Sequence, residues 1–465
     1  MKRNVLVLEI NEITWNLIDP LIEAGKLPTF ARLKSEGAWA APLSVDLPPQ
    51  LDPWITWTTV HTGRTQAEHN VYHLQQPPET IHAPRLWEIC DDAGLKVGVY
   101  GSLCSYPPQK VDGFYVPDTF SPDVETFPAN LSPIQRLNLT YTRSARLPDD
   151  KDGLLFKAKL GSDLLRLGLS LTTCRKILQQ LAKEKINPEI RWQRAALQPE
   201  VNFDFFTNLY RKYRPDFATF HTNHVAHYQH TYWKAMQPDA FQQPTTEDEK
   251  RIYGEAIEFG YGSADNLLNR ALSLCDENTV LIVASSMGQK PYISSLDKGK
   301  QIGQLRSLER LAEILDVNNK AKFLSVMSDQ FNIYPNDDST KQSVQQNLSK
   351  VYVDSPDCPM FHVNELEDFL TVTLGHYDKI DENSRCYFPH QDKNFLYSDL
   401  VYETGMIKSG CHDPEGMLIL YGNGIRHCHI TDSTNLDIAP TVLSLLSTSV
   451  PPEMKGNVLS EAFDF

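Results

Sequence analysis

The 465-residue chain has no apolar run near the length that crosses a membrane, no C-x-x-C pair among its eight cysteines, and no internal repeat or low-complexity tract. It also has fewer basic than acidic residues, 44 against 59, so its formal net charge is −15. These absences argue against a membrane-spanning protein, a disulfide framework, a structural zinc site and a general nucleic-acid binder, which needs a basic surface. The acidic balance also argues against adhesion to anionic membranes.

The first residues and the cysteines indicate the cellular compartment of the protein. The apolar run Val5–Leu8 is interrupted by Glu9, too early for the core of a secretion signal. Scattered cysteines are typical of reduced thiols. The sequence therefore predicts a cytoplasmic protein with a small-molecule substrate and without nucleic-acid or membrane partners, and it leaves the oligomeric state open.

The composition and the patterning predict a globular α/β protein. Hydrophobic residues make up 41% of the chain and aromatic residues 10%, enough for a sizeable core. Buried-strand patterns such as Val5–Leu8 and Lys96–Gly101 alternate with helical patterns, which favours a mainly parallel sheet sandwiched between helices. We expect five segments: a first half of the core in 1–120, a helical cap insertion in 121–200, a second half of the core in 201–300, a small α+β insertion in 301–400, and a closing strand and helix in 401–465.

Functional residues of parallel sheets lie just after the strands, at the carboxyl edge. Here these positions are Glu9–Glu12, Ser102–Tyr106, His221–His230, Ser285–Gln289 and the loop around His412. The histidine-rich stretch is the most unusual of them, because His224, His227 and His230 recur every three residues. On a helix they would drift slowly around one face.

Several of these segments together resemble one family. The stretches "VLVLEINEITWNLIDPLIEAGKLPTFARLKSEGA", "WITWTTVHTGRTQAEHNV", "HTNHVAHYQHTYW", "VLIVASSMG" and "GCHDPEGMLILYGNGI" stand in the order of the core motifs of the type I phosphodiesterase / nucleotide pyrophosphatase branch of the alkaline phosphatase superfamily. The resemblance implies that superfamily's core fold. It also implies two metal ions held by carboxylates and histidines, with a Ser or Thr that attacks phosphorus between them.

The resemblance also shows departures at the metal and nucleophile positions. Neutral residues stand where the family has metal-binding carboxylates or histidine, at Asn11, Asn223, Ser286 and Met287. The nucleophile position falls near Asp52-Pro53, where no hydroxyl stands. His227 and His412 match unchanged. The resemblance therefore implies at most one metal ion, zinc, manganese or iron, held by His227, His412 and Asn223, or no metal at all.

Three residues are the catalytic candidates: Asp52, His227 and His412. Asp52 is a nucleophile or base, or equally the N-cap of a helix with Pro53 at its first position. His227 and His412 suit acid–base work, although a histidine can also cap a helix or form a core hydrogen bond. For His230 the structural role is the favoured interpretation, and Glu12 is either a base or a helix-start residue. The substrate-binding candidates are Asn11, Thr56, Trp57, His224, Ser286 and Gln289.

The resulting hypothesis is an atypical enzyme of this fold, a hydrolase or group transferase acting on a small anionic or sugar-linked ester with at most one metal ion. The alternative is a non-catalytic relative that binds a ligand or partner, because the lost carboxylates would remove most of the charge that holds two cations. A third alternative is an ordinary two-metal phosphodiesterase with replacement carboxylates, for which Glu9, Glu12 and Asp52 are the nearby candidates.

Overall fold

An eight-stranded sheet organises the chain in the computed structural model, which describes residues 3–464 except 49, 73–75, 77, 143–153, 242–243, 294–300, 326–329, 367–368, 376–379 and 408. In spatial order its strands are β19 (Cys428–Ile430), β2 (Ala38–Ala40), β18 (Met417–Tyr421), β6 (Thr279–Ser285), β1 (Asn4–Ile10), β5 (Phe217–Thr222), β3 (Val97–Tyr100) and β4 (Gly113–Val116). β6, β1, β5, β3 and β4 run parallel, and β18 is antiparallel to β6. The predicted α/β class with a mainly parallel sheet is confirmed.

Both faces of the sheet are buried, as the strand sequences require. Side chains alternate along β1, so Leu6, Leu8 and Ile10 enter one core, while Val5 and Val7 enter the other. Glu9 follows in the second set and is also fully covered, at 1% exposure. A carboxylate buried at the end of a strand needs partners, which marks this end of β1 as a polar site.

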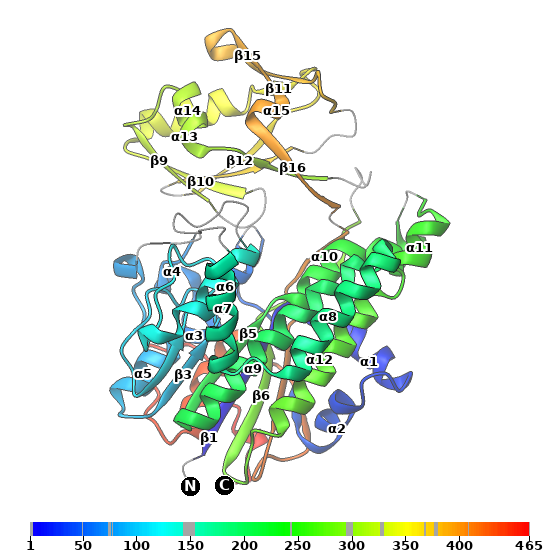
Figure 1. Cartoon of the computed structure of the whole chain (residues 1–465). Coiled ribbons are helices and arrows are strands. Elements are labelled where there is room, and N and C mark those ends of the chain that lie inside the picture. The colour runs from blue at the N-terminus through cyan, green and yellow to red at the C-terminus, as the bar shows by residue number, and fades with distance from the viewer. Residues whose placement is uncertain are drawn as a thin grey trace.

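Helices cover the two faces in separate layers (Figure 1). The first core includes residues of α1 (Trp15–Glu23), α2 (Pro28–Glu36), α9 (Leu197–Tyr213), α10 (His224–Met236) and α12 (Ala256–Leu272). The second includes residues of α3 (Pro53–Thr62), α5 (Leu86–Asp92) and α16 (Ile438–Leu445). Two short helices, α4 (Gln66–His69) and α11 (Glu247–Tyr253), lie in the connections.

Helices also dominate the segment expected to be a cap. These are α6 (Ser132–Thr142), α7 (Leu154–Leu167), α8 (Leu171–Ile186) and the 3₁₀ helix η3 (Pro188–Ala196). Leu131, Ile134 and Leu164 of this segment join the first core, so the cap packs on the same side of the sheet as α9.

A third core lies in the polar segment that follows β6. Its strands are β8 (Gln301–Leu305), β9 (Ala321–Ser325), β10 (Gln330–Pro335), β11 (Tyr352–Val353), β12 (Phe361–Glu365), β13 (Leu370–Leu374), β14 (Arg385–Phe388), β15 (Lys393–Leu396) and β16 (Val401–Ile407), and its helices are α13 (Leu308–Ile314), α14 (Asp338–Leu348) and α15 (Tyr397–Leu400). Its buried residues, from Leu311 to Val401, form a hydrophobic cluster of their own. The exact boundaries of the five segments stay a prediction.

This insertion lies beyond the edge at which β1 and β5 end, whereas both termini lie together at the opposite end of the molecule (Figure 1). A two-stranded ribbon of β7 (Gly288–Pro291) and β17 (Gly410–Asp413) leads into and out of the insertion. Within the described residues, none of the helices combines the length and the apolar character needed to cross a bilayer. The ends of β1, β5 and β6 and this ribbon bring several of the candidate residues together.

Candidate metal centre and active site

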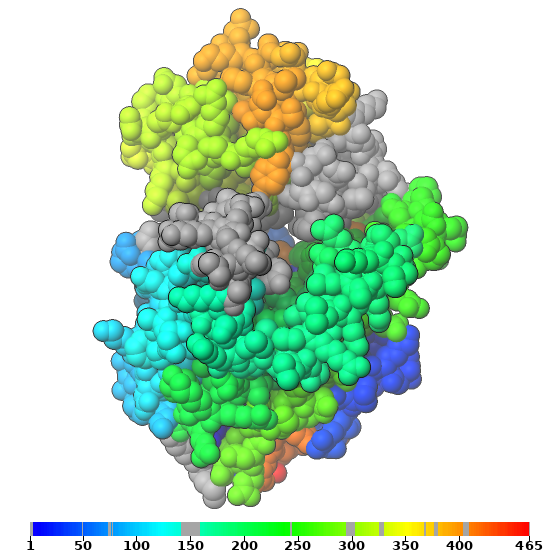
Figure 2. Space-filling model, in the orientation of Figure 1, coloured from blue at the N-terminus to red at the C-terminus, as the bar shows by residue number. Residues whose placement is uncertain are grey.

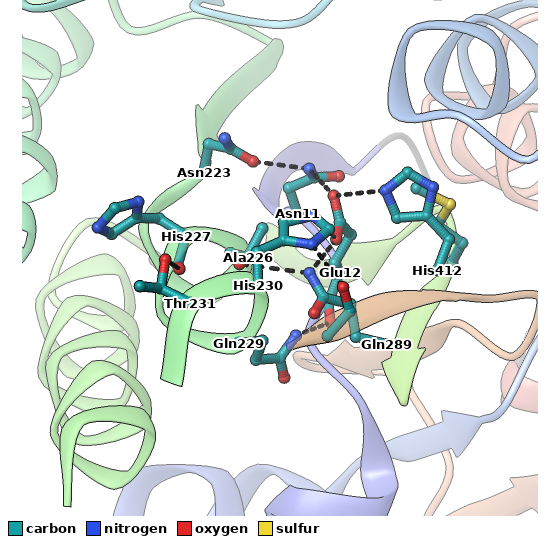
Figure 3. Close-up of polar contacts among 12 residues, drawn as sticks. Asn11, Glu12, Asn223, Ala226, His227, Gln229, His230, Thr231, Gln289 and His412 are labelled. Atoms are coloured by element: carbon teal, nitrogen blue, oxygen red, sulfur yellow. Dashed lines mark hydrogen bonds and ion pairs between the residues drawn. The ribbon is translucent and has the colours of Figure 1, made fainter. Parts of the chain in front are cut away.

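Glu12 is the centre of the polar site. It follows β1 with a left-handed backbone, φ 61°, a conformation that costs a non-glycine residue about 1–2 kcal/mol. Its side chain is buried at 2% exposure. The backbone carbonyl of Glu12 accepts from Gln229 Nε2 at 2.8 Å, and Gln289 Nε2 donates to the carboxylate. The strained backbone therefore aims a buried carboxylate at a defined point (Figure 3).

Two histidines converge on this carboxylate. His230 Nε2, from α10, lies 2.9 Å from Glu12 Oε2, and His412 Nε2, from β17, lies 3.7 Å from Glu12 Oε1. On the far side of each ring, Nδ1 lies near a backbone carbonyl: His230 Nδ1 is 3.1 Å from the oxygen of Gly410, and His412 Nδ1 is 2.7 Å from that of Leu51. A carbonyl oxygen only accepts, so both Nδ1 atoms carry the proton.

The ring orientation leaves two ways to satisfy the Nε2 atoms. Either each Nε2 presents a lone pair to a cation shared with Glu12, or each imidazole is protonated and pairs with the carboxylate. Burial raises the pKa of Glu12, but the charges of protonated His230 and His412 outweigh it and lower that pKa to about 2, so the carboxylate is ionised in the second case. As a metal ligand the carboxylate would be ionised as well. A histidine that ligates a metal typically donates its other N–H to a backbone carbonyl, as both do here.

The donor set fits one cation. The three ligand atoms of Glu12, His230 and His412 lie within 4.8 Å of one another, and no other group of this kind occurs among the described residues. Two histidines and one carboxylate hold catalytic zinc and non-haem iron in proteins, with positions left open for substrate.

The neighbouring position does not fit a second cation. Trp57 Nε1, which can only donate, gives its hydrogen to Asn11 Oδ1 at 2.8 Å. The amide NH₂ of Asn11 therefore faces Glu12 Oε1 at 2.8 Å and Asn223 Oδ1 at 2.7 Å. A donor NH₂ at this point repels a cation, and the amide oxygen of Asn11 is already engaged.

Uncharged residues also stand at the end of β6. Ser286 Oγ and Thr56 Oγ1 are 2.8 Å apart and share a hydrogen bond, and both residues are fully buried. Met287 is also fully buried, while Ser285 Oγ donates to its carbonyl at 2.6 Å. Of the predicted substrate-binding residues, Asn11 and Gln289 bond to Glu12, Trp57 bonds to Asn11, and Thr56 pairs with Ser286.

Asp52 and two of the predicted histidines lie differently. Asp52 is the N-cap of α3, and its carboxylate accepts from the backbone N–H of Trp54 at 2.9 Å. His227 lies on α10 with its ring directed away from Glu12 (Figure 3), beside Tyr228 and Tyr232. His224 is buried and its Nδ1 is 2.9 Å from Thr222 Oγ1; burial lowers the pKa of its imidazole to about 3. The structure thus joins His412 to Glu12 and His230, and leaves His227 outside.

A second carboxylate–histidine cluster surrounds Glu9, three residues before Glu12. Glu9 is 2.9 Å from His61 Nε2 and 3.3 Å from His221 Nδ1, and Trp57 packs against both rings. Burial raises the pKa of Glu9, but the two histidines outweigh it and lower that pKa to about 2. His221 Nε2 has no partner among the described residues. The rings of His61 and His221 hold Trp57 in place, and the indole of Trp57 in turn fixes the orientation of Asn11.

A cavity of about 120 Å³ adjoins the site where Asn11 meets Asn223. Its wall includes the side chain of His221 and, among the described residues, no Asp, Glu, Lys or Arg. Its carboxamides and aromatic residues come from the core and from the cap, and they are Asn11, Asn138, Gln198, Asn202, Asn223, Tyr100 and Phe120. Carboxamides both donate and accept, so the cavity suits an uncharged polar group such as a sugar ring.

Sequence reasoning missed Glu12 and His230 as the partners of His412. The available signal for Glu12 was its place directly after the strand-end Asn11, which had already made it a candidate replacement carboxylate. For His230 the signal was weaker, because the sequence alone does not fix which face of α10 is turned toward β17. The structure shows that face through the hydrogen bond of His230 to Gly410.

The chain is similar to known proteins in sequence and in fold. The type I phosphodiesterase / nucleotide pyrophosphatase family model matches residues 5–379. No curated protein matches the chain significantly. A solved structure, phosphonoacetate hydrolase from Sinorhizobium meliloti 1021 in complex with phosphonoacetate, is 14% identical with a TM-score of 0.48, over 96% of this chain and 96% of that one. The family match confirms the resemblance seen in the sequence: the chain belongs to the type I phosphodiesterase / nucleotide pyrophosphatase family.

Proposed function

We propose that the protein is a one-metal hydrolase that cleaves an ester of a small anionic or sugar-linked molecule. The observation that carries the proposal is the convergence of His230 Nε2 and His412 Nε2 on the ionised Glu12, with both Nδ1 atoms donating to backbone carbonyls. Family membership supports hydrolysis as the reaction class. Transfer of the same group to an acceptor other than water needs the same residues.

The ligands Glu12, His230 and His412 would hold the cation, for which zinc, manganese and iron are the candidates. When bound, such a cation supplies Lewis acidity toward an ester oxygen. Gln289 donates to Glu12 and so fixes the carboxylate, while Gly410 and Leu51 fix the two rings. The chain thus provides a rigid ligand set without large movements of side chains.

Neighbouring groups would bind the substrate. The paired hydroxyls of Thr56 and Ser286 offer polar contacts to an anionic group. The carboxamide cavity beside Asn11 and Asn223 would take the uncharged part, such as a sugar. We assign Asp52 the capping role, because its carboxylate is engaged by the start of α3, and we propose His412 with His230 as the functional histidines.

One observation favours the non-catalytic alternative. The network of Trp57, Asn11 and Asn223 is satisfied by its own hydrogen bonds, and no nucleophile hydroxyl stands at Asp52-Pro53. A protein that only binds a ligand needs neither a second cation nor a nucleophile. The two functions differ in turnover, so one experiment separates them.

The experiment measures the metal content of protein purified without chelator, by elemental analysis, together with turnover of phosphate monoesters, phosphate diesters and sulfate esters. The variants are Glu12→Gln, His230→Ala and His412→Ala, and His227→Ala is the matched control on the same helix. We expect about one cation per chain in the wild type and in the control, and its loss in the other three. Turnover should fall about a hundredfold or more with the cation.

Each outcome has a distinct meaning. Wild-type protein without metal, even after incubation with zinc, manganese or iron, would refute the metal centre. One cation per chain without turnover of any ester would support the binding role instead. Loss of metal in His227→Ala but not in His230→Ala would return the site to the ligands expected from the family resemblance.

A further inference from the structure

The outer face of the cap exposes an unusual set of apolar side chains. On α8, Leu171 is 80% exposed, Leu178 67%, Leu181 42% and Ile186 87%, and Leu165 of α7 is 49% exposed. Isolated exposed leucines are common on protein surfaces, but a cluster within one short segment marks an interaction site. The cap forms part of the face turned to the viewer in Figure 2.

Helix geometry collects these residues into a stripe. At about 100° per residue, Leu171, Leu178 and Leu181 fall within roughly 80° of one another around α8. The residues that pack inward lie on a separate arc of the helix, centred about 100° from the stripe. On that arc Thr173 and Glu184 are buried and Ile177 contacts the first core. The exposed stripe is therefore not the side that stabilises the fold.

The exposed charges of α8 itself are all positive. Arg175, Lys183 and Lys185 of α8 are exposed, and Lys176 is also basic but pairs with Glu200 at 2.9 Å. The one acidic residue of α8, Glu184, faces inward and bonds to Arg194. Residues 154–186 contain seven Lys or Arg and two Asp or Glu, a net charge of +5 in a chain of −15. The expectation of no membrane partner rested on the total charge, which hides this local reversal.

We infer that α8 docks on the surface of a bilayer that contains anionic phospholipids. A helix with an exposed apolar stripe and flanking Lys or Arg lies in the plane of the interface, with its leucines among the acyl chains and its cations at the headgroups. The long stems of Arg175 and Lys185 allow their charges to reach the headgroups while the stripe is buried. This inference is independent of the metal centre and of any turnover.

Charge complementarity favours the lipid surface over a second copy of the chain. Pairing two α8 stripes would bring Arg175 and Lys185 of one chain close to those of the other, and like charges repel. An anionic bilayer offers both an apolar layer and negative charge to the same face. A homodimer through α8 is therefore the competing outcome that the experiment must detect.

The experiment is co-sedimentation of the full chain with vesicles of phosphatidylcholine, with and without phosphatidylglycerol, at low and at high salt. One variant combines Leu171→Ser, Leu178→Ser and Leu181→Ser, and a second combines Arg175→Glu, Lys183→Glu and Lys185→Glu. The matched control removes three exposed apolar residues from a stretch without cations: Leu43→Ser, Val45→Ser and Leu47→Ser. Circular dichroism confirms that each variant is folded.

We expect the wild type and the control to bind the anionic vesicles, and each α8 variant to lose about tenfold or more in partition. Binding should also weaken at high salt and without phosphatidylglycerol. Wild-type protein that stays in solution with every vesicle would overturn the inference. So would a dimer, measured by light scattering, that the leucine variant converts to monomers.

Discussion

At the scale of single residues, the state of His230 and His412 is decided by atoms outside the triad. The carbonyls of Gly410 and Leu51 fix a proton on each Nδ1, which leaves each Nε2 to a cation or to a second proton. Asn11 is fixed in the same way by the indole of Trp57. The chemistry of the site is therefore set by hydrogen bonds to groups that do not react.

The first prediction concerns Asn11→Asp, which introduces the carboxylate that the family resemblance implies at this position. The new carboxylate would place an acceptor oxygen where the NH₂ now faces Glu12 and Asn223. Without metal, we expect the free energy of unfolding to fall by about 2–4 kcal/mol. Excess zinc should recover most of it by occupying a second position. Urea denaturation with chelator and with zinc tests this, and equal stability of variant and wild type in chelator would contradict it.

The second prediction concerns the pH dependence of stability. Burial raises the pKa of Asp46 to about 6, partly offset by hydrogen bonds from Thr59 and Asn435. Because this pKa exceeds the unfolded value, the folded state binds more protons, and stability falls as pH rises from about 4 to above 6. Asp46→Asn removes the penalty. We expect the variant to gain up to about 3 kcal/mol over the wild type near pH 7 and little near pH 4.

Urea denaturation at the two pH values measures that difference. The neutral amide can still accept from Thr59 Oγ1, which now donates to Asp46 Oδ2 at 2.7 Å, so the substitution changes charge more than hydrogen bonding. Asp118 is also buried with a pKa of about 6. It is present in the wild type and in the variant, so its contribution cancels in the difference between their stabilities. A gain that is the same at both pH values would show that Asp46 does not titrate in this range.

At the scale of elements, the site depends on how closely β17 approaches α10. A Cβ atom at Gly410 would lie 2.6 Å from the carbonyl oxygen of Gln229 and would also meet the side chain of Gln289. Only glycine lets the carbonyl of Gly410 reach His230. The rotation of α10 about its axis matters equally. His227 and His230 are three residues apart, so their side chains leave the helix in directions about 60° apart, and only one of them can face Glu12.

The third prediction compares two glycine substitutions. Gly410→Ala should lower the free energy of unfolding by about 1–3 kcal/mol through overpacking and weaken metal binding by displacing His230 or His412. Gly262→Ala in α12 is the control, because no atom outside its chain neighbours and the adjacent helix backbone lies within 4 Å of its added Cβ. The control should gain about 0.5–1 kcal/mol from the helix propensity of alanine. Thermal denaturation with metal titration tests both, and unchanged metal affinity in Gly410→Ala would contradict the close-approach argument.

At the scale of the whole molecule, the buried apolar residues that the structure describes form three clusters. Two lie on the faces of the main sheet, and the third belongs to the insertion between Leu311 and Val401. The third cluster shares no residue with the other two. A chain with separate cores does not have to unfold as one cooperative unit.

The fourth prediction is that the insertion unfolds in a transition of its own. Leu370 is fully buried in the third cluster, and Leu370→Ala should cost about 2–5 kcal/mol there. Differential scanning calorimetry should show one transition lowered and the other unchanged, with metal content retained. Leu281→Ala, in the main sheet, should lower the other transition. A single transition shifted by both variants would show one cooperative unit.

Much of the fold was predictable because it depends on local patterns. The buried-strand patterns Val5–Leu8 and Lys96–Gly101 correspond to β1 and β3. The sequence also placed candidate residues at the strand ends, which is where the site lies. The part that could not be predicted is which of them meet, because Glu12, His230 and His412 come from three distant segments.

The sequence by itself determined the mainly parallel α/β sheet, through its periodicity, and the family, through the resemblance of its ordered motifs. Only the tertiary structure decided that His230 rather than His227 faces Glu12, and that Asp52 caps α3. The reason is physical: the rotation of α10 against β17 is set by packing between segments far apart in the chain, and a rotation of one residue moves every side chain to another face.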